Sequence, residues 1–347
     1  MKTYRDPETG YEVRQYTFGP ERNAKHYFTT ENFTADDKYF FFTKEKVDPQ
    51  RDQDVVEGLY RADVETGEIT LMADAGYTAF CMHYEENYAL LYRTADSMVC
   101  RMDVETGEKT ELGRFPKGAV RTSHLTVSRD GRIACSLQLE NKIYALAYLD
   151  PGQTEAQVAF MTDQCIGHCQ ICPSDSNQIF YVHETTGDAL QRTWMYDVSY
   201  RMSRPYYVEQ PNEWITHETW SADGTEMALM WIPGKIIIGD KDGRHFDVAF
   251  ESERRILHPG ISRDKQWLCT DMTWPREDGK WRWAVALVNP RTGKHTLLAH
   301  TRGNCLTGSD HLHPSFNRAG DKILFSAPDE NGVAQVCVID LNQVQRP

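Results

Sequence analysis

The sequence predicts an all-β protein, a single seven-bladed β-propeller that spans residues 1–347. Short apolar runs recur along the chain, a turn signal precedes each run, and long helical patterns are absent. The turn centres fall near residues 36, 86, 130, 175, 223, 264 and 319, a spacing of 41 to 55 residues. That spacing accommodates four short strands with their loops, which is one propeller blade. Two packed β-sandwiches are the alternative, and the regularity of the seven units disfavours them.

Each turn is followed by an apolar run that we expect to form the strand leaving a hairpin. In chain order these runs are 39–42, 88–92, 133–137, 178–182, 227–231, 267–270 and 322–325. A second signal repeats later in the unit: Asp-Val-Glu-Thr-Gly-Glu occurs at 63–68 and at 103–108, with a looser copy at 289–294. These segments predict tight hairpins in which glycine takes the position that needs positive φ.

The last unit indicates how the ring closes. It offers an innermost strand near 314–316 and further strands near 322–325 and 335–339, but it lacks a fourth. The N-terminal run 11–18 is an extended segment without a blade of its own. We therefore expect this N-terminal strand to pair with the last unit and close the final blade.

Composition limits the classes of partner and the compartment. The chain is 40% hydrophobic, carries a formal net charge of −13 and has no run of Lys or Arg, which argues against nucleic acid. A local cationic pocket can still bind a small anion. No secretory leader or membrane span is evident, so the protein is expected to be cytoplasmic, with no membrane partner and with its nine cysteines as reduced thiols. The oligomeric state has no signal in the sequence.

Five histidines lie about six residues before five of these turns: His124, His168, His217, His258 and His313. In a propeller this place is the crossover onto the inner strand. Successive blades should therefore bring the imidazoles together around one mouth of the channel. Histidine binds metals and transfers protons near neutral pH, so this face is the predicted functional face.

A metal site is predicted from His311-Leu312-His313, because alternate residues of a strand point to the same side. His258, in the neighbouring blade, adds a third nitrogen. Three histidines with an open position describe a catalytic or substrate-binding metal. A Cys-x-x-Cys at Cys169 and Cys172, close to Cys165, suggests zinc or redox chemistry, but no second pair stands at the required spacing, and buried thiols are favoured.

Two more residues of the same face have both a structural and a catalytic interpretation. His217 is either a channel histidine bonded to backbone or a general base. Arg192 follows the second strand of the fourth blade, on a connection that emerges on the histidine face, and is either a rim ion-pair partner or a site residue. A peptidase is excluded because no G-x-S-x-G elbow is present. A propeller that only binds other molecules, without catalysis, is the non-enzyme alternative.

The chain also resembles the oligogalacturonate lyases, cytoplasmic seven-bladed propellers of pectin breakdown. The matching segments are in family order and cover most of the chain: Asn-Ala-Lys-His-Tyr-Phe at 23–28, Gly167-His168, His183-Glu184, Arg-Thr-Trp-Met at 192–195, Thr-His-Glu-Thr-Trp at 216–220, His258, and His-Leu-His-Pro-Ser-Phe at 311–316.

The resemblance implies a lyase that cleaves small acidic, uronate-containing oligosaccharides by metal-assisted β-elimination. It implies a manganese-type divalent ion at His258, His311 and His313, a catalytic base at His217 and a catalytic arginine at Arg192. The same face offers further candidates for contact with substrate, which are His168, His183, Lys25 and His26; for Lys25 and His26 a packing role stays open.

The chain departs from the family pattern at two positions. Gly308 stands where the family has a glutamine metal ligand, and Leu312 stands where the family tends to have proline. The fourth ligand is then missing, a water, or a neighbour such as Asn304 or Asp310. A divergent lyase that acts on another uronate glycoside is therefore an alternative.

Overall fold

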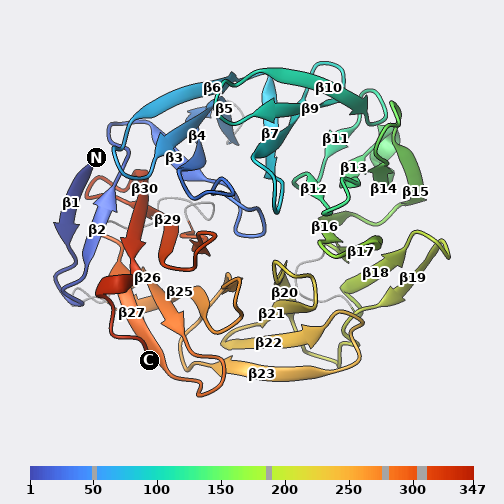
Figure 1. The fold of residues 1–347 in the computed structure, drawn as a ribbon. Helices are drawn as coiled ribbons and strands as arrows, with labels where there is room; N and C mark the ends of the chain where they lie inside the picture. The colour runs from blue at the N-terminus through green and yellow to red at the C-terminus, as the bar shows by residue number, and fades with distance from the viewer. Residues whose placement is uncertain (49–52, 185–189, 276–280, 303–310) are drawn as a thin grey trace.

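Seven antiparallel sheets surround a central axis, which confirms the predicted seven-bladed β-propeller (Figure 1). The computed structural model describes residues 1–48, 53–184, 190–275, 281–302 and 311–347. Within that part of the chain each sheet contains the strands of one predicted repeat, and we number the blades in chain order from the one that begins at residue 22.

The strands follow one another blade by blade around the ring. Blades 1 and 2 contain β3 (Arg22–Lys25), β4 (Tyr39–Asp48), β5 (Gln53–Asp63), β6 (Ile69–Asp74), and β7 (Tyr77–Met82), β8 (Tyr88–Arg93), β9 (Met98–Asp103), β10 (Lys109–Arg114). Blades 3 and 4 contain β11 (Val120–Arg121), β12 (Thr126–Val127), β13 (Ile133–Gln138), β14 (Tyr144–Leu149), β15 (Gln157–Thr162), and β16 (Ile166–Cys172), β17 (Asp175–His183), β18 (Thr193–Asp197), β19 (Met202–Pro205).

Blades 5 and 6 contain β20 (Ile215–Trp220), β21 (Glu226–Trp231), β22 (Lys235–Asp240), β23 (Phe246–Glu251), and β24 (Gly260–Ile261), β25 (Leu268–Pro275), β26 (Trp281–Val288), β27 (His295–His300). Blade 7 contains β28 (Ser315–Phe316), β29 (Lys322–Pro328), β30 (Ala334–Asp340), β2 (Glu12–Gln15) and β1 (Lys2–Arg5). Two short 3₁₀ turns, η1 (Glu140–Lys142) and η2 (Leu341–Gln343), follow β13 and β30.

The turns are where the sequence predicts them. The turn near residue 223 joins β20 to β21, and the turn near 319 joins β28 to β29. The repeated segment at 63–68 joins β5 to β6, with Gly67 at φ 73°. There the Asp63 carboxylate accepts the backbone N–H groups of Glu65 (3.0 Å) and Thr66 (2.7 Å), which explains why the segment needs an aspartate as well as a glycine.

The N-terminus closes the ring, as predicted. β2 pairs with β30 through the register Val13↔Ile339, and Val13 is fully buried. The Tyr16 hydroxyl donates to the backbone oxygen of Val64 in blade 1 at 2.5 Å, so the closing segment also ties blade 7 to its neighbour. β1 adds a fifth, outer strand that the sequence does not predict, because residues 2–5 are mostly exposed and lack an apolar alternation.

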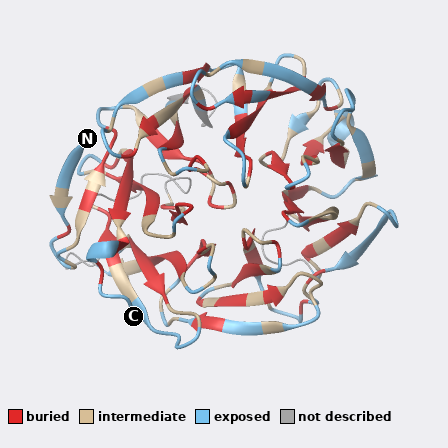
Figure 2. Cartoon of the chain, in the orientation of Figure 1, coloured by how far each residue is buried: buried red, intermediate tan, exposed pale blue. Residues whose placement is uncertain are grey.

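The hydrophobic core lies between the blades. Figure 2 shows buried residues concentrated on the inner and middle strands, with exposed residues on the outer strands. One cluster joins Phe40 and Phe42 of blade 1 to Leu324 and Val338 of blade 7. Middle strands have neighbours on both faces, so they consist of continuous apolar runs such as Val285–Val288 rather than alternating ones. Such packing places each inner strand at a fixed distance from the axis.

Two further expectations concern cysteines and membranes. The eight cysteines among the described residues are free, and all except Cys165 are buried. In the same part of the chain no helix has the length and apolar character to cross a membrane.

Candidate active site

The structure brings the five periodic histidines together around one residue, Tyr27. The phenol ring of Tyr27 lies 5.4 Å from the imidazole of His124, 6.0 Å from His168, 5.9 Å from His258 and 4.9 Å from His313, measured between ring centroids. Around the channel the imidazoles also contact one another in blade order. These separations are 6.1 Å for His168–His217, 4.4 Å for His217–His258 and 4.3 Å for His258–His313. We call this group, His124, His168, His217, His258 and His313, the histidine ring.

An unusual backbone conformation repeats in the histidine ring. His168, His217 and His313 have φ values of 47°, 50° and 47°, in the left-handed region. In β16 and β20 the strand register shifts at this place, between Gly167 and Gln170 and between Thr216 and Thr219. Such bulges re-aim a side chain, and strained backbone of this kind concentrates at functional sites. The periodic spacing of the sequence does not reveal this conformation.

Three histidines form a group that can hold a metal ion. One ring nitrogen from each of His258, His311 and His313 lies within 4.8 Å of the others, and among the described residues this is the group with metal-ligand spacing. We call these residues the histidine triad. The candidate positions for a fourth ligand, Gly308, Asn304 and Asp310, lie outside the described residues.

A buried carboxylate supports the histidine triad. Asp271, on β25 and fully buried, accepts from the backbone N–H of His258 at 2.9 Å and lies 2.8 Å from its Nδ1. The carboxylate therefore fixes the tautomer that leaves Nε2 of His258 free to bind a metal, the usual arrangement behind a metal-bound histidine. Sequence reasoning missed Asp271, although a charged residue inside the apolar strand Leu268–Pro275 was a usable signal.

Two of the three imidazoles in the histidine triad favour the neutral form that a metal requires. Burial, with the neighbouring imidazole of His311, lowers the pKa of His258 well below its ordinary value. Burial and His258 do the same to the pKa of His313. Neutral imidazole is the ligand form, so these residues fit a divalent transition ion.

His217 lies between the histidine triad and the rest of the ring. Its Nδ1 is 3.0 Å from the hydroxyl of Tyr27, which comes from the segment after β3. Burial, followed by the charges of His258 and His168, lowers the pKa of His217 well below its ordinary value. A neutral imidazole held by one nitrogen can take up a proton on the other. Tyr27 belongs to the Asn-Ala-Lys-His-Tyr-Phe segment at 23–28, but its role was not predicted.

Arg192 lies in a second cluster, on the other side of His217. Its Nη2 is 3.2 Å from Oε2 of Glu184, and its side chain is 4% exposed. Glu184 also contacts Nε2 of His168 at 3.2 Å, while the fully buried Glu218 lies 2.7 Å from Nδ1 of His168. No role was predicted for either glutamate.

The pKa of His168 is shifted in the opposite direction from those of its neighbours. Burial opposes the charged form, but the Glu218 carboxylate and its hydrogen bond, with Glu184, outweigh burial and raise the pKa of His168 above its ordinary value. By contrast, burial and Arg121 lower the pKa of His124 to about 4. The ring therefore combines neutral imidazoles with one that favours the protonated form.

The remaining predicted contact residues separate into two groups. Lys25, His26, His311 and His313 line one cavity of about 250 Å³. Nζ of Lys25 donates to the backbone oxygens of His26 (2.8 Å) and His313 (2.6 Å), and burial lowers its pKa to about 7. His26 stacks on Phe80 at 4.2 Å.

His183 is placed differently from the other predicted contact residues. It packs against Tyr181 and Trp194, each at 5.8 Å between ring centroids, within blade 4. Its connection to the ring is indirect, because its backbone oxygen accepts from Nη1 of Arg192 at 3.2 Å.

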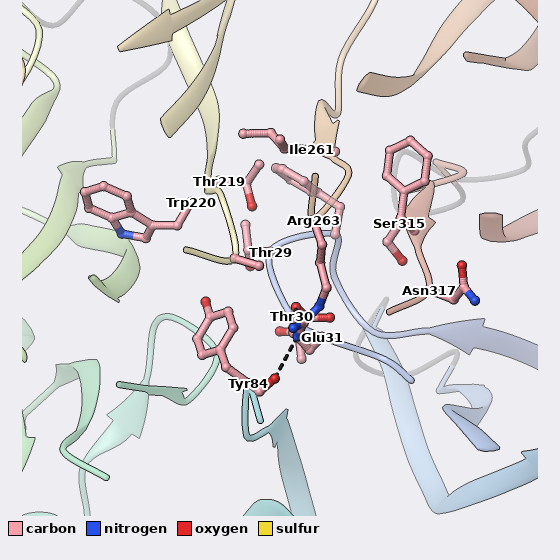
Figure 3. Close-up of a pocket in the computed structure, with 14 residues that line it drawn as sticks. Thr29, Thr30, Glu31, Tyr84, Thr219, Trp220, Ile261, Arg263, Ser315 and Asn317 are labelled. Atoms are coloured by element: carbon pink, nitrogen blue, oxygen red, sulfur yellow. Dashed lines mark hydrogen bonds and ion pairs between the residues drawn. The ribbon is translucent and has the colours of Figure 1, made fainter. Parts of the chain in front are cut away.

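A separate small pocket lies among β20, β24, β28 and the segment that follows β3. It has a volume of about 50 Å³ and is lined by residues that include Thr30, Thr219 and Ser315 (Figure 3). Arg263 donates from Nη2 to the backbone oxygen of Tyr84 at 2.7 Å on its wall. Phe28 lines this pocket, and its ring also lies 5.1 Å from the His258 imidazole, so it contacts both the pocket and the histidine ring.

Comparisons with known proteins give a fold but no sequence family. No protein-family description and no curated protein matches the sequence. A solved oligogalacturonate lyase in complex with manganese is similar with a TM-score of 0.84 and 18% identity, covering 99% of this chain and 96% of that one. An oligogalacturonate lyase from Vibrio parahaemolyticus has a TM-score of 0.83 and 17% identity, covering 98% and 96%.

Other solved structures are similar to a lesser degree. A chain of the mitotic checkpoint complex has a TM-score of 0.58 and 9% identity, covering 97% of this chain and 96% of that one. At such identities the likeness establishes architecture, and one architecture serves many functions. The chain therefore has the seven-bladed β-propeller fold of the solved oligogalacturonate lyases.

Proposed function

We propose that the protein is a lyase that cleaves short uronate-containing oligosaccharides, similar to oligogalacturonate, by metal-assisted β-elimination. The observation that carries the proposal is the position of His217. Its imidazole, neutral and held by Tyr27, lies 4.4 Å from that of His258, which belongs to the histidine triad. A proton acceptor thus stands beside a metal-binding group, in a fold shared with two solved lyases of this type.

In β-elimination a base removes the proton on C5 of a uronate, a C4=C5 double bond forms, and the bond from C4 to the linking oxygen breaks. That oxygen keeps the bonding electron pair and takes up a proton, so the leaving sugar carries a hydroxyl group. The C5 proton is weakly acidic because the adjacent carboxylate already carries charge. A divalent ion at the histidine triad would supply Lewis-acid chemistry that neutralises this carboxylate.

The side chains of the site have distinct tasks in this reaction. If His217 donates from Nδ1 to the Tyr27 oxygen, Nε2 carries the lone pair that accepts the C5 proton. Arg192 binds a carboxylate or stabilises the developing charge with its planar guanidinium. Lys25, which lines the adjacent cavity, adds a hydrogen-bond donor, and in its protonated form a positive charge, at a site on an otherwise acidic protein.

We assign Mn²⁺ to the histidine triad. Imidazole nitrogens suit several first-row divalent ions, so the ligand set alone does not select one. The manganese complex of one structurally similar lyase supports this choice.

The experiment is an ultraviolet assay for unsaturated uronide, with digalacturonate and Mn²⁺, together with metal analysis of each variant. We expect His217→Ala to keep its metal and to lose activity by about 10²- to 10⁴-fold, the range for a general base. The double variant His311→Ala/His313→Ala should lose both. His245→Ala is the control, because His245 is exposed and pairs with Asp247 outside the site.

Two outcomes would contradict the proposal. Full activity in His217→Ala removes this residue as the base. If the metal-loaded protein cleaves none of a panel of uronate disaccharides, the alternative of a non-catalytic binding propeller is favoured. Cleavage of a uronate disaccharide other than digalacturonate would support the proposed β-elimination and would assign a different substrate.

A further inference from the structure

We propose that Arg192 and His168 form a second carboxylate-binding site in the histidine ring, and that Glu184 occupies it when no substrate is bound. A uronate carboxylate would then displace Glu184 and take over its two contacts. The inference rests on the proposed function and extends it, since it assigns the substrate two neighbouring acidic sugar units, one at this site and one at the histidine triad.

The contacts of Glu184 are those of a bound carboxylate. One oxygen, Oε1, lies 3.2 Å from Nε2 of His168, and the other, Oε2, lies 3.2 Å from Nη2 of Arg192. Both oxygens thus contact nitrogen donors of basic side chains, the kind of charge-assisted contact that binds carboxylates strongly. A uronate presents the same group with the same charge.

Glu184 is the member of the cluster that can leave. Its side chain is 33% exposed, whereas those of Glu218 and Arg192 are 0% and 4% exposed. An ion pair that is partly in water contributes only about 0–1 kcal/mol, so an incoming carboxylate can replace it. Glu218 remains on Nδ1 of His168 and keeps that imidazole oriented.

Arg192 does not depend on Glu184 for its position. Its backbone N–H donates to Glu209 at 2.7 Å, and its Nη1 donates to the backbone oxygen of His183 at 3.2 Å. A third contact reaches Thr216 at 3.5 Å. The guanidinium would therefore stay in place after Glu184 moves away, as a preorganised binding group must.

A glycine makes room for the carboxylate. A Cβ built on Gly167 would approach Oε1 of Glu184 to 2.6 Å and its Cγ to 2.8 Å, so any side chain at this position would force the Glu184 side chain to move. The Glu184 side chain thus lies across bare backbone beside His168. The space that it fills there would be available to a ligand carboxylate.

The second site and the histidine triad lie on either side of His217. The His168 imidazole is 6.1 Å from that of His217, which is in turn 4.4 Å from that of His258. Two acidic sugar units held at these two places would bracket the proposed base. This arrangement would favour an oligosaccharide with consecutive uronates over one with a single acidic unit.

The test measures affinity in the metal-free protein by calorimetric titration with digalacturonate and, separately, with neutral galactobiose. The variants are Glu184→Gln and Glu184→Asp, whose shorter side chain does not bridge both donors. Glu111→Gln is the matched control, because it removes a carboxylate from a surface pair with Arg93 at 2.6 Å.

Replacing Glu184 removes the internal competitor, so the Kd for digalacturonate should fall about two- to fivefold. This ratio corresponds to the free energy that a partly exposed ion pair contributes. The affinity of the Glu184 variants for galactobiose should equal that of the parent protein. The Glu111→Gln control should match the parent protein for both disaccharides. With Mn²⁺ loaded, KM for digalacturonate should fall more than kcat changes.

If both Glu184 variants bind digalacturonate with unchanged or weaker affinity, the inference is overturned and the lyase proposal stays intact. A fall in kcat at constant KM also overturns it, because Glu184 would then orient the catalytic groups. If neither the parent protein nor any variant binds or cleaves a uronate, the proposed function itself fails. This result differs from failure of the Glu184 inference alone, in which the parent protein still cleaves uronides.

Discussion

The hydroxyl oxygen of Tyr27 lies 3.0 Å from Nδ1 of His217, across 190 positions of sequence. Tyr27 comes from blade 1 and His217 from blade 5, so only closure of the propeller brings them together. The contact gives the proposed base a fixed orientation. It also links the two sides of the histidine ring, because the Tyr27 ring approaches His168 on one side and His313 on the other.

Tyr27→Phe removes this hydrogen bond and keeps the ring in place. We expect kcat on the uronide substrate to fall about 10- to 100-fold, the usual effect of losing a group that orients a site residue, with KM nearly unchanged. Steady-state kinetics with Mn²⁺ measure both constants. Tyr181→Phe, which deletes a hydroxyl bonded to Ser203 at 3.0 Å, should leave both constants unchanged. Equal rates for Tyr27→Phe and the parent protein would show that the contact has no catalytic role.

Asp271→Asn should weaken metal binding. The substitution replaces the acceptor at Nδ1 of His258 by an amide and removes the buried charge that favours a bound cation. We expect Mn²⁺ affinity to fall about 10- to 100-fold, measured by titration of chelator-treated protein. Asp247→Asn is the matched control, since Asp247 contacts His245 at 3.0 Å on the surface. Parent-like Mn²⁺ affinity in Asp271→Asn would argue against the histidine triad as the metal site.

Asp6 should make the closure of the propeller sensitive to acid. Its carboxylate accepts the backbone N–H of His300 at 2.7 Å and of Thr9 at 2.9 Å, and these bonds together with the His300 side chain outweigh burial, so that its pKa lies below the ordinary value. A depressed folded pKa gives stability that is present above the unfolded pKa of about 3.8 and is lost as pH falls through the folded pKa.

Asp6→Asn should therefore lower the free energy of unfolding at pH 7 by about 1–3 kcal/mol, the cost of mismatched buried hydrogen bonds. The difference from the parent protein should shrink as pH falls below the unfolded pKa, because the parent then loses the same charge. Thermal denaturation over a pH series measures it. A difference that is constant through this range would exclude Asp6 as the titrating group.

Deletion of residues 1–18 should destabilise blade 7 more than deletion of residues 1–5. The longer deletion removes β2, exposes the edge of β30, and takes away the buried side chains of Val13 and Tyr16. Each such side chain contributes about 1.5–3 kcal/mol when buried. The shorter deletion removes β1, which is mostly exposed. Thermal midpoints and light scattering compare the two; equal stability would contradict the role of β2 in closure.

Much of the fold was predictable because its signals are local. Turn spacing and apolar runs depend on neighbouring residues, so they located the inner hairpins and the closing segment 11–18. β1 was missed for the same reason, since an exposed edge strand needs no apolar alternation. The site was predictable only in part: the periodic histidines were visible, and three of them adopt a left-handed backbone that no spacing indicates.

The sequence by itself determined the number of blades, the way the ring closes, and the end of the channel where histidines gather. The tertiary structure decided the partners of those histidines. Asp271 selects a tautomer of His258, Tyr27 orients His217, and Glu184 lies between His168 and Arg192. These pairings depend on distances of a few ångströms between segments that are mostly on different strands or blades. Repeat spacing indicates which residues face the axis, and only packing determines which atoms meet there.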